Sequence, residues 1–308
     1  MNHRKYVTYG LKSITYYFYN MAEGCNKILK HRAQGLSNTI PTVKKHMYKQ
    51  NSASEKLCEG IEQYYVFKED ECCEIEKQIE KVMHDANNGK FKPFTVDKTR
   101  LRVKYFFGER YTYGDGFGEE VLFPKGEVDP IPVWISRLII TPLELAGIFP
   151  IGFINSAVIN MYLPGGCIVS HIDPPQIFER PIVSASFFSD CLLSFGCKFS
   201  FKPIRVSNPV FTLPLLRGSV LCLSGFAADS ITHSIRPQDV KTRRAAIILR
   251  RVFDDAPRLT WGQFSRMSGD NNDSSFIYRI RRKRSFDESE KLPEEINKKA
   301  RFDKKYGT

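Results

Sequence analysis

The sequence predicts a mainly β protein with flanking helices, on the strength of three observations. Short runs rich in β-branched and aromatic residues recur between residues 155 and 252, separated by Gly, Pro and Asp; this is the pattern of an all-β sandwich or barrel. Two stretches upstream have the apolar spacing of helices. Hydrophobic residues make up 42% of the chain, so it can form a core and is not a fully disordered protein.

The first elements along the chain are a strand and a helix. Residues 61–67, Ile-Glu-Gln-Tyr-Tyr-Val-Phe, are predicted to form a strand, because the last four are all aromatic or β-branched. A helix is expected from Glu69 to Met83, because apolar residues recur there on one face and acidic residues occupy its first turn. The run Asn87-Asn88-Gly89 ends it.

A dense aromatic and basic segment, residues 101–113, reads as strand–turn–strand. A second helix is expected from Pro132 to Leu145, with Pro142 limiting its end. The β-rich runs that follow are residues 157–163, 167–170, 182–188, 193–201, 219–223, 232–235 and 245–252.

The positive charge lies at the two ends of the chain. The formal net charge is +12, of which residues 1–50 carry +8 and residues 279–308 carry +5, so the middle is near neutral. Basic arms favour polyanions without reading sequence, although such runs also serve as solvated tails. We expect these basic, flexible tails to contact nucleic acid. No uninterrupted apolar run is long enough for a bilayer, so no membrane contact is expected.

Two histidines in the β-rich part stand out as metal ligands. His171-Ile172-Asp173 places two ligand-type side chains on one side of a strand, and His233 lies in another predicted strand. Two His and one carboxylate form the facial set that holds non-haem Fe(II). By itself the pattern is weak, because a surface His beside a capping Asp is the commoner explanation.

Arg250 adds a second signal. It ends a strongly apolar strand, where an arginine is costly to bury unless it meets an anion. A dicarboxylate cosubstrate supplies such an anion, and a guanidinium can bind it in bidentate fashion. The alternative is a strand-end residue that reaches solvent, and the residues alone leave the two open.

Longer strings of residues form a recognisable pattern between about residue 60 and residue 252. They are Arg102-x-Lys104-Tyr-Phe-Phe-Gly-Glu-x-Tyr111-Thr-Tyr-Gly, Asn160-Met-Tyr162-x-Pro-Gly-Gly, His171-x-Asp173-Pro, Phe195-Gly-Cys-Lys-Phe, His233-x-x-Arg236-Pro, Arg244 and Arg250. These strings resemble the AlkB family of Fe(II)/2-oxoglutarate dioxygenases, and most closely its RNA N6-methyladenosine demethylase branch.

The resemblance implies a double-stranded β-helix (jelly-roll) core with N-terminal helices and a nucleotide-recognition lid. Residues 1–55 are basic with weak periodicity, and apolar residues thin out after Phe253. The chain is therefore expected to consist of a flexible region 1–55, a dioxygenase domain 56–255 and a disordered tail 256–308. Within the domain, the lid spans about residues 98–118 and the core about 155–252.

The resemblance also implies the site. Fe(II) would bind His171, Asp173 and His233. The keto-acid end of 2-oxoglutarate would chelate this iron. Arg250 would meet the distal carboxylate of 2-oxoglutarate, and the residues expected to complete that pocket are Arg244, Asn160 and Tyr162. In the lid, Arg102 would contact the nucleotide, and Lys104 and Tyr111 would lie near the methylated amine and handle protons. Of the aromatic residues in this segment, about half are expected in the core.

The implied reaction uses O2 and removes the N6-methyl group of N6-methyladenosine in single-stranded RNA, releasing formaldehyde and succinate. Unstacking a base costs least in a single strand. The alternatives are a 2-oxoglutarate-dependent hydroxylase of protein side chains and a catalytically inactive RNA-binding module with the same fold. A monomer is expected, and the basic run 279–284 with Lys298-Lys299 resembles a nuclear import signal, so the nucleus is the expected location.

Two departures from the family pattern concern cysteine and the iron motif. The residue after the second His is Ser234, where vertebrate members of this branch have a Cys that pairs with the one matching Cys197. That bridge cannot form here, and we expect the eight cysteines to be free. Pro175-Gln176 also replaces the more usual Ile-His beside the iron motif, which bears on fine substrate contacts.

Overall fold

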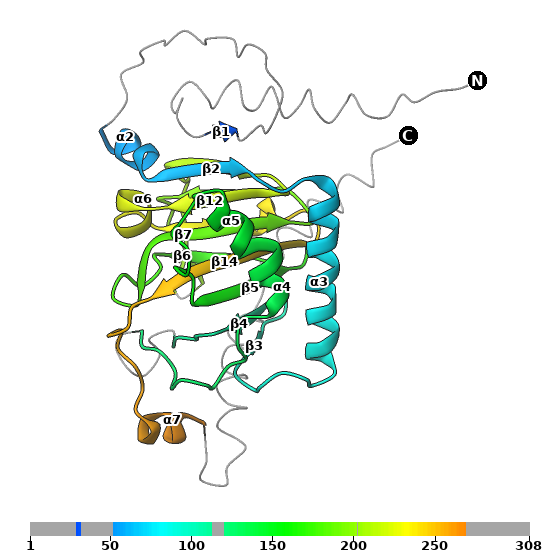
Figure 1. Cartoon of the computed structure of the whole chain (residues 1–308). Helices are drawn as coiled ribbons and strands as arrows, with labels where there is room; N and C mark the ends of the chain where they lie inside the picture. Colours follow the sequence, from blue (N-terminus) through cyan, green and yellow to red (C-terminus); the bar gives the residue numbers. More distant parts are fainter. Residues whose placement is uncertain (1–28, 32–51, 113–119, 202, 269–308) are drawn as a thin grey trace, which may run out of the picture.

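The computed structural model describes residues 29–31, 52–112, 120–201 and 203–268 (Figure 1). Several predictions fall outside these residues: most of the N-terminal basic region, Tyr113 with the end of the proposed lid, and the run that resembles an import signal. Among the described residues, no helix combines the length and the apolar character that crossing a bilayer requires.

Two antiparallel β-sheets form the centre of the fold. The order of the larger sheet is β1 (Leu29–His31), β2 (Ile61–Tyr65), β12 (Ser219–Leu223), β7 (Phe178–Phe187), β14 (Arg244–Val252), β5 (Ser156–Tyr162), β4 (Arg102–Phe107) and β3 (Val96–Lys98), with only β1 and β2 parallel. The smaller sheet has the order β11 (Phe211–Leu215), β8 (Cys191–Phe195), β13 (His233–Ile235) and β6 (Ile168–His171). A separate hairpin consists of β9 (Phe199–Phe201) and β10 (Ile204–Val206).

The two sheets face each other across one apolar core. Leu193 and Leu215 from the smaller sheet pack in one buried cluster with Leu221 and Leu223 from β12 of the larger sheet. Alternate residues of a strand point to opposite faces, so each sheet contributes one set of side chains to this interior. This arrangement is the jelly-roll that the resemblance implied, and the fold class is confirmed.

Helices cover the outer face of the larger sheet. Figure 1 shows α3 (Glu69–Asn87) and the short helices α4 (Val133–Ile135) and α5 (Thr141–Leu145) lying over the strands. Ile75 and Ile79 of α3 are fully buried in one cluster with Val183 of β7 and Ile247 of β14. Burial of these apolar faces from both sides explains why the central strands are hydrophobic along their whole length. At one end of the fold, α2 (Ser52–Glu59) packs against α6 (Gly225–Asp229).

The upstream predictions are confirmed with adjusted bounds. The strand at 61–67 is β2, and the helix from Glu69 continues past Met83 to Asn87, where Asn88 caps it and Gly89 has a positive φ of 69°. The second helical stretch is also present, but a π-helical turn, Ser136–Ile140, interrupts it before Pro142. Proline lacks a backbone N–H to donate, so it sits in the first turn of α5 rather than ending the stretch.

The structure adds detail to two parts of the predicted domain organisation. The segment expected to form a lid is in its first half the strand β4, which pairs with β5 on one side and β3 on the other. Tyr105, Phe106 and Phe107 of this strand are in the core, consistent with the expectation that about half of the aromatic residues pack there. The tail predicted to start at 256 is ordered to Ser268, because the chain continues into helix α7 (Trp261–Ser268) and Phe264 is buried.

Candidate metal centre and cosubstrate pocket

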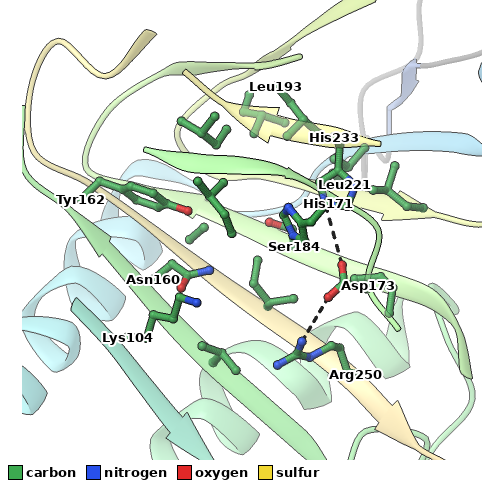
Figure 2. A pocket seen from close by; sticks show the side chains of 18 of the residues that line it. Lys104, Asn160, Tyr162, His171, Asp173, Ser184, Leu193, Leu221, His233 and Arg250 are labelled. Carbon is green, nitrogen blue, oxygen red and sulfur yellow. Dashed lines mark hydrogen bonds and ion pairs between the residues drawn. The ribbon is translucent and has the colours of Figure 1, made fainter. Parts of the chain in front are cut away.

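A pocket opens between the two sheets and gathers nine of the ten predicted site residues. Its empty volume, counted together with the space that opens to solvent, is about 740 Å³. Figure 2 shows Lys104 and Asn160 on one side, the histidines and Asp173 on another, and Arg250 beside Asp173. Arg102 is the exception: it does not line the pocket, and its Nη1 donates to the carbonyl of Cys167 at 2.7 Å.

Strand pairing brings the three predicted metal ligands together. His171 ends β6 and is the direct antiparallel partner of His233 in β13, so the two imidazoles lie side by side, with ring centroids 4.4 Å apart. Asp173 follows two residues after His171, and its Oδ2 lies 3.7 Å from Nε2 of His233. One ligand atom from each residue lies within 4.8 Å of the others. The three side chains converge, with Asp173 and His233 buried and His171 half-buried, as suits a metal site.

The electrostatics of these groups also suit a metal. Burial lowers the pKa of His171, and burial together with His171 lowers the pKa of His233 to about 3; both imidazoles are therefore neutral, the form that binds metal. Burial acts to raise the pKa of Asp173, but Arg250 and the two imidazoles outweigh it and hold that pKa below its usual value. Nδ1 of His171 lies 2.9 Å from the carbonyl of Val169, and donating a proton there leaves the Nε2 lone pair available.

Arg250 lies at the metal end of the pocket. Its Nη1 donates to Oδ1 of Asp173 at 3.2 Å, and its guanidinium stacks 4.1 Å from the Phe178 ring centroid. The sequence predicted that Arg250 holds the distal carboxylate of the cosubstrate. The structure instead gives it a protein carboxylate, which satisfies the buried charge of this side chain, only 4% exposed.

Arg244 lies at the opposite end of the same strand. Six residues separate it from Arg250, so the two side chains share a face of β14 and their backbones are about 20 Å apart. Arg244 is 1% exposed and has no carboxylate partner among the described residues; it donates to Oγ of Ser186 at 3.2 Å. Its guanidinium lies 5.4 Å from the Tyr162 ring, and Asn160 Oδ1 nearby is buried without a hydrogen-bond partner. A buried cation without an anion is costly, so this end of the pocket fits a ligand carboxylate.

Lys104 and Tyr111 line the pocket from the side of β4. Lys104 is directly opposite Asn160 across the β4–β5 pair and is 7% exposed. The Tyr111 ring packs edge-on against Phe178, with centroids 5.4 Å apart, and burial raises the pKa of its phenol. Two groups able to exchange protons therefore border the metal and cosubstrate ends of one cavity.

Two residues near the metal ligands, Arg180 and Ser184, were not among the site residues predicted from the sequence. Arg180 donates from Nη2 to the backbone carbonyl of Asp173 at 2.8 Å and from Nε to Asp229 at 2.7 Å. Ser184 on β7 also lines the pocket. Neither lies in a motif with metal-ligand spacing, so only the fold reveals them.

The expectation of free thiols is confirmed for six cysteines and wrong for Cys58; the six are Cys72, Cys73, Cys167, Cys191, Cys197 and Cys222. Cys197 carries a free thiol, and its Sγ lies 3.0 Å from Oγ of Ser234, so the serine occupies the place from which a bridge would form. Cys58, in contrast, is disulfide-bonded, contrary to the expectation that all thiols are free.

Comparison with known proteins agrees with this site. The sequence pattern of the 2OG-Fe(II) oxygenase superfamily matches residues 49–256. The chain is 55% identical to "RNA demethylase ALKBH5" of Xenopus tropicalis over 238 residues, covering 76% of this chain and 66% of that protein. It is 57% identical to the protein of that name from Rattus norvegicus, covering 70% and 55%. It is also 30% identical to "RNA demethylase ALKBH9B" of Arabidopsis thaliana, covering 67% and 41%.

The chain spans between about two fifths and two thirds of the length of these relatives. The match to the superfamily covers most of the described fold, and it includes all three residues of the His171, Asp173 and His233 cluster. The chain therefore belongs to the 2OG-Fe(II) oxygenase superfamily, in which its relatives are AlkB proteins.

Proposed function

We propose that this protein is an Fe(II)- and 2-oxoglutarate-dependent dioxygenase that removes the N6-methyl group of N6-methyladenosine in single-stranded RNA, with release of formaldehyde and succinate. The observation that carries the proposal is one cavity that joins the His/Asp/His cluster to the buried Arg244, which has no ionic partner among the described residues. A metal and a dicarboxylate are the two ligands that these ends fit.

The three metal ligands are His171, Asp173 and His233, and their neutral imidazoles and ionised carboxylate suit Fe(II). When bound, the iron supplies the activation of O2 and the oxidation of the methyl group, the part of the chemistry that belongs to the cofactor. The protein orients Asp173 through Arg250, which fixes one carboxylate oxygen and leaves the other toward the histidines.

Arg244 is the residue that fits the distal carboxylate of 2-oxoglutarate, with Tyr162 and Asn160 beside it. Guanidinium, phenol and amide groups are all suitable donors to carboxylate oxygens. In this proposal Arg244, and not Arg250 as the sequence suggested, binds the distal carboxylate, because Arg250 is already paired with the carboxylate of Asp173. Burial of the Arg244 end excludes water from the bound cosubstrate.

Lys104 and Tyr111 contact the methylated adenine in this proposal and handle protons when the hydroxylated adduct breaks down. Arg102, whose Nη1 donates to the Cys167 carbonyl, contacts the nucleotide at the edge of the pocket. The relatives' printed names support RNA as the substrate. The basic ends add non-specific attraction for its backbone, and we place the protein in the nucleus as a monomer.

The test is mass spectrometry of nucleosides after incubation with Fe(II), 2-oxoglutarate and oligonucleotides that contain N6-methyladenosine. RNA and DNA are compared, each single- and double-stranded. We expect N6-methyladenosine to be converted to adenosine with an equal amount of formaldehyde. The conversion should be fastest for single-stranded RNA. Succinate formed without any adenosine, or formaldehyde absent while candidate peptides are hydroxylated, would replace the RNA substrate with a protein one.

A further inference from the structure

The chain beyond β14 packs against the segment that carries Tyr111. The superfamily match ends at residue 256, yet the fold continues through Pro257–Leu259 into α7. Leu122 donates from its N–H to the carbonyl of Pro257 at 2.8 Å and accepts from the N–H of Leu259 at 2.8 Å. The segment after the family domain is therefore hydrogen-bonded into the structure on the substrate side of the pocket.

Leu122 belongs to one of two short arms that run antiparallel to each other. The first arm is residues 109–112 and the second is residues 120–123, and Tyr111 pairs directly with Leu122. Two backbone bonds of 2.8 Å join the arms, from Thr112 to Val121 and from Phe123 to Arg110. Gly108 starts the first arm: its φ is +79°, and a Cβ there would lie 2.4 Å from the Asn155 carbonyl, so only glycine allows this turn.

One side chain of the following segment holds both arms. Arg258 makes a bidentate ion pair with Glu109 of the first arm, from Nη1 at 2.8 Å and from Nη2 at 3.0 Å. Its Nη1 also donates to the backbone carbonyl of Phe123 on the second arm. The side chains of Arg258 and Glu109 are only 22% and 16% exposed. A bidentate pair sheltered to this degree restrains geometry more than an exposed ion pair does.

An aromatic cluster also joins α7 to the second arm. Phe264 of α7 packs against Phe123 with ring centroids 5.5 Å apart and against Phe94 at 5.0 Å. Leu259 and Phe123 are each 5% exposed in this cluster. The cluster anchors the second arm, and Arg258 links that arm to the first, which bears the pocket residue.

These contacts restrain Tyr111, which is part of the candidate site. It is the one residue of the two arms that lines the pocket among those described, and its ring lies 5.4 Å from the Arg250 guanidinium. Glu109 precedes it by two residues, and Leu122, its direct partner, pairs with Arg258 on its other side. The position of the Tyr111 ring therefore depends on residues outside the family domain.

We propose that Arg258 is a positioning residue for the demethylation reaction: by tying Glu109 and Phe123 together, it holds Tyr111 against the methylated base. The proposal rests on the proposed function for its substrate. It assigns a positioning role to the segment 257–268, none of whose residues lines the pocket.

The test compares three variants of the full chain. Arg258→Gln removes the charge that pairs with Glu109, whereas Arg258→Lys keeps a charge there. Arg217→Gln is the matched control, because Arg217 is also ion-paired, with Glu76 of α3 at 2.6 Å, but lies in the turn between β11 and β12 and not in the two arms. Each is assayed for formaldehyde and succinate with methylated RNA, for succinate without RNA, for melting temperature, and for hydrogen exchange of the peptides covering residues 108–124.

In Arg258→Gln, kcat/KM for RNA is expected to fall about tenfold, a size typical of losing a charged hydrogen-bond partner. Succinate formed without RNA is expected to stay at the wild-type rate, so the ratio of succinate to formaldehyde rises. Exchange at residues 108–124 is expected to quicken. Arg258→Lys should recover most of the RNA activity, and Arg217→Gln should melt lower with an unchanged ratio.

The proposal is overturned if Arg258→Gln keeps the wild-type ratio of succinate to formaldehyde, or if exchange at residues 108–124 is unchanged. It is also overturned if Arg217→Gln shifts the ratio as much, since the effect then reflects stability alone. A wild-type protein that forms succinate but never formaldehyde from RNA would refute the proposed function instead. In that case the exchange measurement still decides whether Arg258 positions the arms.

Discussion

Arg250 and Asp173 form a buried ion pair at the edge of the metal cluster. Nη1 of the arginine donates to Oδ1 of the aspartate at 3.2 Å, while Oδ2 of the same carboxylate lies 3.7 Å from Nε2 of His233. One oxygen of the Asp173 carboxylate is therefore hydrogen-bonded to Arg250, and the other is directed toward the histidines. Groups that orient a metal ligand in this way affect metal binding as strongly as they affect activity.

The two buried arginines of β14 should therefore give different defects. Arg250→Gln is expected to weaken Fe(II) binding by about 10–100-fold, because Asp173 loses the group that orients it. Arg244→Gln is expected to raise the 2-oxoglutarate concentration for half-maximal succinate formation, with metal affinity near wild type. Anaerobic metal titration and cosubstrate titration separate the two. If Arg250→Gln altered only the 2-oxoglutarate requirement, the distal role predicted from the sequence would be reinstated.

Removing a metal ligand should abolish turnover without unfolding the protein. His171→Ala and Asp173→Ala are expected to lose formaldehyde and succinate formation and keep the β-rich circular dichroism spectrum, because the core clusters do not depend on these side chains. His84→Ala is the matched control, since His84 lies exposed on α3 with its side chain 73% exposed. Turnover near the wild-type rate in either ligand variant, with iron and cosubstrate supplied, contradicts the ligand assignment.

Metal affinity of the folded protein should be nearly independent of pH between 7.5 and 6. Two ordinary imidazoles with a pKa of 6.5 would take up protons over this interval, and affinity would fall about tenfold. Here burial lowers the pKa of His171, and burial with its neighbour lowers that of His233 to about 3, so neither imidazole must lose a proton. Anaerobic Fe(II) titrations at both ends of the interval test this, and a tenfold loss at pH 6 would show that at least one imidazole is accessible to protons.

Ser234→Cys should create a disulfide with Cys197. The present Sγ–Oγ separation of 3.0 Å requires only a small side-chain adjustment to reach bonding distance. The bridge is expected to stabilise the fold by about 2–4 kcal/mol under oxidising conditions. Thiol counting and melting curves with and without reductant measure it. The double variant Ser234→Cys/Cys197→Ser serves as control, and a Ser234→Cys protein whose melting ignores reductant would disprove the bridge.

The sequence by itself determined the ligand set and the class of fold. His171-x-Asp173 and His233 are local patterns whose chemistry depends on residue type, and strand alternation fixes which side chains share a face. The helix from Glu69 and the central strands were predictable for the same reason, since each buries a periodic apolar face. Short strands such as β3 (Val96–Lys98) and β11 (Phe211–Leu215, with Pro214 inside it) were missed, because pairing with a neighbour, and not local propensity, makes them strands.

Only the tertiary structure distinguishes the protein contacts of the two buried arginines in the pocket. Arg244 and Arg250 are both buried cations on one strand, and nothing local distinguishes them. The difference arises because the loop after β6 brings Asp173 to Arg250, while Arg244 meets no carboxylate in the part of the chain that the structure describes. The contact of Arg258 with Glu109 joins residues 149 positions apart and is equally invisible in the sequence. Pairing between distant segments costs chain entropy, and only the contacts of the complete fold offset that cost. Such a pairing therefore has no local pattern in the sequence.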